Sequence, residues 1–146
     1  MMQSGRYHLV MSVFDGDTIL LDDNRRIRLI GVEAPALQSP YGDKDHFGKE
    51  SKKYLASLIL NKKVSLTITD TQKDGFGSIP AFVYLGDVLV NGRVIRDGWA
   101  RSSRIFHHTY GDLFTAYERE AHSRGLGMWK QQKKTDNDET YDRDRN

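Results

Sequence analysis

The sequence predicts an α+β fold, in which a small, partly open Greek-key barrel of five β-strands carries three packed helices. Three observations lead to this prediction. Segments that alternate or run apolar follow one another closely at 7–14, 17–21 and 26–32. A segment with helical periodicity then separates them from two further strand-like segments, and helical patterns fill most of the remaining chain.

The first three predicted strands are joined by two short polar turns. Asp15-Gly16 is a common hairpin signal, because glycine accepts the positive φ that such turns need. The second turn, DDNRR, leads into RIRLIGV at 26–32. Three strands in such quick succession predict a β-meander.

The pattern changes to a helical period after the loop APALQSPYGDKD. Apolar and small side chains share one helical face, formed by Phe47, Ser51, Tyr54, Leu55, Leu58 and Ile59. Lys49, Lys52 and Lys53 fall on the other face, where they are either a solvated surface or part of a basic edge. A first helix is therefore predicted before the chain returns to strands.

The second half predicts two strands and two helices. VSLTIT and IPAFVYL are the strands, and the loop DTQKDGFGS separates them. A short helix is expected over VNGRVIRDG and a longer one over about 112–124, where Leu113, Tyr117 and Ala121 are spaced by four. Trp99 and Trp129 are interpreted as core. The OB-fold is the five-stranded barrel that this order favours.

Composition is typical of one soluble domain with a single core. The chain has 146 residues, of which 38% are hydrophobic and 29% charged. Residues 1–129 are predicted to form the domain, and 130–146 a disordered tail whose charges balance. The formal net charge of +2 therefore lies on the folded body. It permits a polyanionic partner without requiring one.

The sequence carries no sign of membrane insertion, secretion or disulfide bonding. No apolar run approaches the roughly 18 residues of a membrane span, and no secretory h-region is visible. A cytoplasmic location is the default expectation, although a secreted protein whose leader had been removed would look the same. The absence of cysteine excludes disulfides and thiolate metal sites.

Three short stretches could carry chemistry, namely DGDT at 15–18, RLIGVEAP at 28–35 and DGFGS at 74–78. If the strand ends converge, Asp17 and Glu33 could share a hard cation, and oxygen ligands of this kind suit calcium better than zinc. Arg28 would then face a phosphate bound by that cation. The alternative is that DGDT is only a tight turn, with Glu33 a surface carboxylate paired with Arg28.

The sequence resembles the staphylococcal nuclease (thermonuclease) family across residues 7–129. The resemblance rests on VFDGDTILL, RIRLIGVEAP, PYGDKDHFGKES, DGFGSIPAFVYL, VNGRVIRDGWA and AYEREAHSRGLGMW, which occur in the family's order and spacing. It implies an OB-fold barrel with three helices. The enzymes of this family hydrolyse phosphodiesters of DNA and RNA with one calcium ion.

The resemblance also implies roles for individual residues. Asp17 matches a metal carboxylate, Glu33 stands where the family usually has a metal-binding Asp, and Ala34 would offer its carbonyl. Asp15 and Thr18 would lie just outside the metal shell. Arg28 matches the first phosphate-binding arginine.

Two positions depart from the family pattern. Ala36 stands where the catalytic glutamate is usual, and Ser78 where the second arginine is usual. General-base assistance is worth about a factor of 10² to 10⁴, and one preorganised charge contact is worth about 10² to 10³. Hydrolysis by the family's own route is therefore expected to be weak or absent. Candidate substitutes are Asp43, Asp45, Glu50 and Lys73.

Basic and aromatic residues indicate how nucleic acid would be bound. The candidate contacts, by resemblance or as stacking groups, are Phe76, Arg101, Arg104 and Phe106, with Tyr41 and Lys44 nearby. His107 and His108 are interpreted as loop residues. The leading hypothesis is a nuclease-like domain that binds nucleic acid or a phosphodiester. The alternatives are a working calcium-dependent nuclease with relocated catalytic groups and a protein-interaction module without nucleic-acid affinity.

Overall fold

The computed structural model describes residues 6–37, 47–70, 73–103 and 108–130. The strands are β1 His8–Asp15, β2 Thr18–Leu21, β3 Arg26–Leu29, β4 Val32–Glu33, β5 Lys63–Thr67, β6 Ile79–Leu85, β7 Val88–Leu89 and β8 Arg101–Ser102. The helices are α1 Gly48–Ile59, α2 Val90–Arg96 and α3 Gly111–Arg124. The three helices and the five longest strands, β1, β2, β3, β5 and β6, follow one another in the predicted order.

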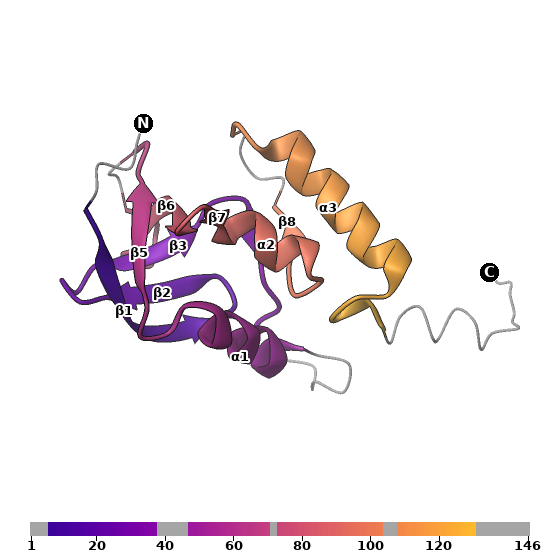
Figure 1. The fold of residues 1–146 in the computed structure, drawn as a ribbon, viewed down its shortest axis with the longest axis horizontal. Coiled ribbons are helices and arrows are strands. Elements are labelled where there is room, and N and C mark those ends of the chain that lie inside the picture. The colour runs from indigo at the N-terminus through magenta and orange to yellow at the C-terminus, as the bar shows by residue number, and fades with distance from the viewer. Residues whose placement is uncertain (1–5, 38–46, 71–72, 104–107, 131–146) are drawn as a thin grey trace, which may run out of the picture.

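Five of the strands form a closed barrel (Figure 1). The hydrogen-bonded order is β3-β2-β1-β5-β6, and β3 pairs with β6 in a parallel register that places Arg28 opposite Pro80. All other barrel pairs are antiparallel. This mixed barrel with three helices is the predicted OB-fold, so the fold class is confirmed. Closure brings the loop before β6 next to the β1–β2 turn and β3.

The segment 26–32 is two strands in the structure instead of the one strand predicted. The chain turns at Gly31, whose φ is +79°. A side chain there would also collide, because an added Cβ would lie 2.7 Å from His108 Nε2 and 2.9 Å from Phe114 Cδ2. Beyond this turn, β4 leaves the barrel and pairs with β8, which places Glu33 opposite Arg101.

The helices cover the barrel from different sides. α1 packs against β1, whereas α2 lies between β6 and α3 (Figure 1). The buried face of α3 differs from the predicted one: Phe114 is fully buried, whereas Leu113 is 43% exposed. Leu113 precedes Tyr117 by four residues and Phe114 precedes it by three, and both spacings fit one helical face, so only the packing against α2 decides between them.

One buried polar side chain ties α2 to the barrel. Asn91 is fully buried, and its Oδ1 accepts a hydrogen bond from the Val83 N–H at 2.8 Å. Its Nδ2 donates to the carbonyls of Ile30 and Ala81, at 3.0 and 3.1 Å. We call this set of contacts the Asn91 junction. Every polar atom of the Asn91 side chain has a partner in it, as burial requires.

Two further predictions concern the two tryptophans and the chain end. Trp129 is buried, as predicted, and Trp99 is half-buried against the core. The predicted tail lies outside the described residues except for Lys130. None of the helices described in the structure combines the length and apolar character needed to span a membrane.

Candidate functional site

A pocket of about 270 Å³ opens where the β1–β2 turn, β3 and the loop before β6 meet. We call it the mouth pocket. Its lining residues are Phe14, Asp15, Asp17, Thr18, Arg26, Arg28, Asp74, Phe76 and Ser78. Barrel closure therefore brings together side chains from all three stretches that the sequence singled out.

The β1–β2 turn presents Asp17 through local hydrogen bonds. The Asp17 N–H donates to Asp15 Oδ1 at 3.0 Å, and Thr18 Oγ1 donates to Asp17 Oδ1 at 3.0 Å. The backbone N–H of Leu29 on β3 donates to the Asp17 carbonyl at 2.9 Å. The residue predicted as a cation ligand is thus held by its neighbours and by the adjacent strand.

Gly16 in this turn is required for a reason other than the predicted positive φ. Its φ lies outside the left-handed region. A Cβ at Gly16 would instead lie 2.0 Å from Ser51 Oγ of α1 and 2.7 Å from Ala34 Cβ. Glycine is needed because the turn packs directly against α1 and the chain after β4.

Arg28 joins the two predicted metal carboxylates. Arg28 Nη2 lies 3.3 Å from Asp17 Oδ2 and 3.5 Å from Glu33 Oε1, and it donates to the Val32 carbonyl at 3.1 Å. Arg28 Nε is buried and has no hydrogen-bond partner among the described residues. The two carboxylates therefore converge on one cationic group.

Asp17 is an unusual carboxylate because it is only 7% exposed. Burial, followed by the nearby Asp15 carboxylate, raises the pKa of Asp17 from 3.8 to about 7. Arg28 and the Ala34 N–H, which donates to Asp17 Oδ2 at 2.9 Å, act in the opposite direction. The charged form of Asp17 is thus only partly compensated by the protein.

The donor set around Asp17 and Glu33 fits a hard divalent cation. Both side chains offer carboxylate oxygens, and Glu33 is half exposed, so it can turn toward an ion. Across the described ranges, no group of three or more His, Cys, Asp or Glu side chains could hold a metal ion. An ion bound here would therefore need backbone and water oxygens as well, as calcium commonly does.

The loop before β6 is closed by Asp74. Asp74 Oδ1 accepts hydrogen bonds from the N–H groups of Phe76 at 2.8 Å and Ser78 at 2.9 Å. Gly77, with a φ of +83°, allows the tight return. This geometry leaves Phe76 82% exposed at the edge of the mouth pocket and Ser78 buried at its wall.

Other predicted residues lie apart from the mouth pocket. Ala36 is exposed, and it does not line the pocket; neither do Glu50 and Lys73. The Arg101 guanidinium lies 4.7 Å over the ring of Trp129. Arg104, Phe106, Tyr41, Asp43, Lys44, Asp45 and His107 lie outside the described residues.

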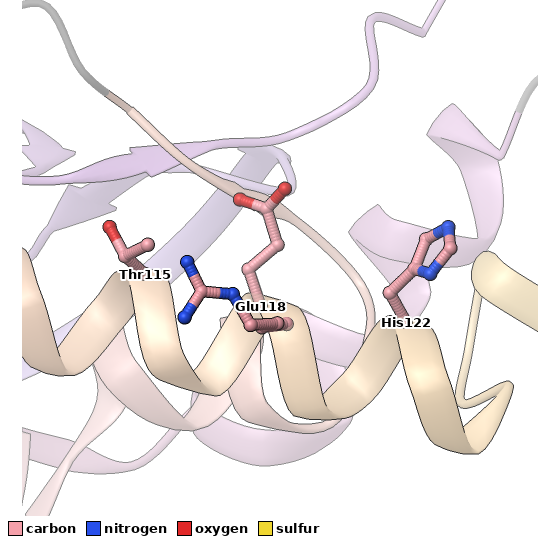
Figure 2. Close-up of a pocket in the computed structure, with 4 residues that line it drawn as sticks. Thr115, Glu118 and His122 are labelled. Carbon is pink, nitrogen blue, oxygen red and sulfur yellow. The ribbon is translucent and has the colours of Figure 1, made fainter.

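His108 and Glu118 contribute to packing near α3. The ring of His108 packs against Phe82 and Phe114, with centroids 5.8 and 5.2 Å apart. Figure 2 shows Glu118 on α3 beside Thr115 and His122, in a separate pocket of about 210 Å³. Glu118 Oε1 accepts a hydrogen bond from the Ser102 N–H at 2.7 Å, so it holds β8, and through β8 the strand that carries Glu33.

Sequence reasoning missed three pocket residues, namely Phe14, Arg26 and Asp74. Arg26 could have been found from its spacing to Arg28, because residues two apart on a strand point to the same face. Asp74 follows from the turn chemistry of Asp-Gly-Phe-Gly. Phe14 carried no signal of its own, since an aromatic residue in a strand is usually core.

Comparison with known proteins gives matches over most of the chain. The family model described as "Staphylococcal nuclease homologue" matches residues 26–131. The thermonuclease of Staphylococcus intermedius is 32% identical over 130 residues, which cover 86% of this chain and 77% of that protein. The thermonuclease of Staphylococcus hyicus is 33% identical over 124 residues, covering 82% and 73%. An uncharacterized endonuclease of Escherichia coli is 32% identical over 125 residues, covering 82% and 74%.

Proposed function

Because the chain belongs to the staphylococcal nuclease homologue family, we propose that it is a nuclease-like domain that binds nucleic acid at the mouth pocket. The observation that carries the proposal is Arg28, which lies between Asp17 and Glu33 in a pocket open to solvent. A guanidinium presents paired donors that match the oxygens of a phosphodiester. The exposed Phe76 ring at the pocket edge offers a surface on which a base can stack.

Asp17 and Glu33 are the side chains that would hold a calcium ion, with Ala34 as a backbone ligand. A bound calcium ion would polarise a phosphoryl oxygen and neutralise part of its charge. Arg28 lies within ion-pair distance of both carboxylates. With an ion beside them, its N–H donors would be released toward the phosphate. Asp15 and Thr18 keep the Asp17 carboxylate in place through the turn.

Hydrolysis is proposed to be weak or absent, because the carboxyl groups that line the pocket have other roles: Asp17 is the proposed metal ligand, and Asp15 and Asp74 accept backbone N–H groups. The methyl group of Ala36 cannot accept a proton. Asp74 lines the pocket, but its Oδ1 is already used by the loop, because it accepts hydrogen bonds from the N–H groups of Phe76 and Ser78. The hydroxyl of Ser78 cannot replace a guanidinium as a charge partner.

Binding and cleavage of a labelled single-stranded DNA oligonucleotide in calcium test the proposal. Arg28→Ala is expected to weaken binding about ten-fold, the loss of one charge-assisted contact. Arg119→Ala is the matched control, since it removes an arginine that does not line the mouth pocket. Absence of binding by the unmodified protein would contradict the proposal. Brisk cleavage that Asp17→Ala abolishes would instead show a working nuclease with another base.

A gain-of-function experiment tests whether Ala36 and Ser78 occupy the positions of the family's catalytic glutamate and second arginine. The double variant Ala36→Glu with Ser78→Arg is expected to raise the cleavage rate by at least about ten-fold, because each group contributes a larger factor in related chemistry. The single variants serve as controls, since groups that act together are non-additive. No gain in the double variant, with an unchanged melting temperature, would count against the assignment of these positions.

A further inference from the structure

The mouth pocket contains a second arginine that the resemblance to the family does not assign. Arg26 precedes Arg28 by two residues on β3, so both side chains leave the strand on the same face. Both residues line the mouth pocket. Arg26 is exposed, whereas Arg28 lies deeper and is partly buried. The pocket wall therefore presents two guanidinium groups at different depths.

The two guanidinium groups differ in what they already bind. Nη2 of Arg28 contacts Asp17, Glu33 and the Val32 carbonyl. The Arg26 guanidinium carbon lies 4.3 Å from the ring centroid of Phe14. In the part of the chain that the structure describes, the Arg26 side chain forms no ion pair or hydrogen bond. Stacking uses only the face of a guanidinium, so the N–H donors in its plane stay available.

The charge balance of the pocket makes the Arg26 guanidinium important. Asp15, Asp17 and Asp74 line the pocket as carboxylates, and Arg28 is shared between Asp17 and Glu33. Without Arg26, the negative charge of these carboxylates would exceed the positive charge that is left to bind an incoming phosphate. Ser78 directly precedes Ile79, which pairs with Ile27 of β3, so it lies near Arg26 but supplies only a hydroxyl.

We propose that Arg26 is a second phosphate-contacting residue, which Phe14 holds over its ring and which supplies the cation that Ser78 lacks. The ligand is a phosphodiester of single-stranded nucleic acid, so this inference rests on the proposed function. Arg26 binds the phosphate through its in-plane donors. Phe14 is a positioning residue, because it acts only through the orientation of Arg26.

The salt dependence of oligonucleotide binding tests this role. Each phosphate contact to a single strand contributes about 0.7 to the slope of log K against log salt. Arg26→Ala is expected to reduce the slope by about that amount and to weaken binding at low salt about ten-fold, with an unchanged melting temperature. Arg26→Lys should leave the salt slope unchanged. Phe14→Leu should weaken binding but also leave the salt slope unchanged. Arg119→Ala is the control, because it removes the same charge from a site outside the mouth pocket.

The outcomes separate this inference from the proposed function. If Arg28→Ala weakens binding while Arg26→Ala matches Arg119→Ala in affinity and slope, the role of Arg26 is overturned and the proposed function stands. A lower melting temperature for Arg26→Ala with an unchanged slope would show a structural role and also overturn it. If the unmodified protein does not bind the oligonucleotide, both are overturned.

Discussion

The mouth pocket and the Asn91 junction both place polar side chains out of water, but they satisfy them to different degrees. Each polar atom of the Asn91 side chain has a backbone partner in the barrel. Asp17 is nearly as buried, yet it carries a charge beside a second carboxylate, and Arg28 compensates it only in part. A satisfied group fixes the packing of a helix, whereas an unsatisfied charge leaves binding capacity for a ligand.

The largest expected effect of a single change is at the Asn91 junction. Asn91→Ala removes three hydrogen bonds and leaves the Val83 N–H and the Ile30 carbonyl buried without the Asn91 partner. The free energy of unfolding is expected to fall by about 3 kcal/mol or more. Urea denaturation measures it. Ser57→Ala, on the exposed face of α1, is the control and should change stability by less than about 0.5 kcal/mol.

An intermediate effect is expected at Gly16, where the turn that carries Asp17 packs against α1. Gly16→Ala would push a methyl group into Ser51 of α1 and Ala34. Overpacking of this kind costs about 1 to 3 kcal/mol, and displacement of the turn should also weaken oligonucleotide binding. Gly75→Ala is the matched control, because no atom lies within 4 Å of an added Cβ there. Equal stability of the two variants would contradict the close packing of the turn.

The smallest effect has the opposite sign, and it concerns Asp17. The pKa of Asp17 is about 7 in the folded state and 3.8 for an unperturbed aspartate, so the folded state binds more protons between these limits. Its contribution to stability is complete below about pH 4 and is lost as the pH rises through about 7. Asp17→Asn removes this loss, since an amide does not titrate.

Calcium-free urea denaturation at pH 5 and pH 8 measures this difference. Asp17→Asn is expected to be more stable than the unmodified protein at pH 8 by on the order of 1 kcal/mol, and the advantage should shrink at pH 5. Other groups titrate in both proteins and cancel. Calcium should stabilise the unmodified protein and have little effect on the variant. A variant that is less stable at pH 8 would show that Asp17 is fully compensated in the folded state.

Local sequence patterns determined the order and type of most elements. Alternation predicted β1, β2 and β6, and the apolar spacing together with Gly125 predicted α1 and α3, because these signals depend on neighbours along the chain. Resemblance to the family was enough to group Asp17, Arg28 and Ser78 in one site. The strand break at Gly31 was missed, since the apolar run continues through it, and its positive φ and its contact with His108 and Phe114 appear only in the structure.

Tertiary structure alone decided which residues meet. The parallel pairing of β3 with β6 brings the loop before β6 to the β1–β2 turn, and no local pattern encodes that closure. Contacts between different elements decide three further features. They are the choice of Phe114 over Leu113, the need for glycine at position 16 and the stacking of Arg26 on Phe14. Periodicity determines which face an element can bury, but only packing determines what that face is buried against.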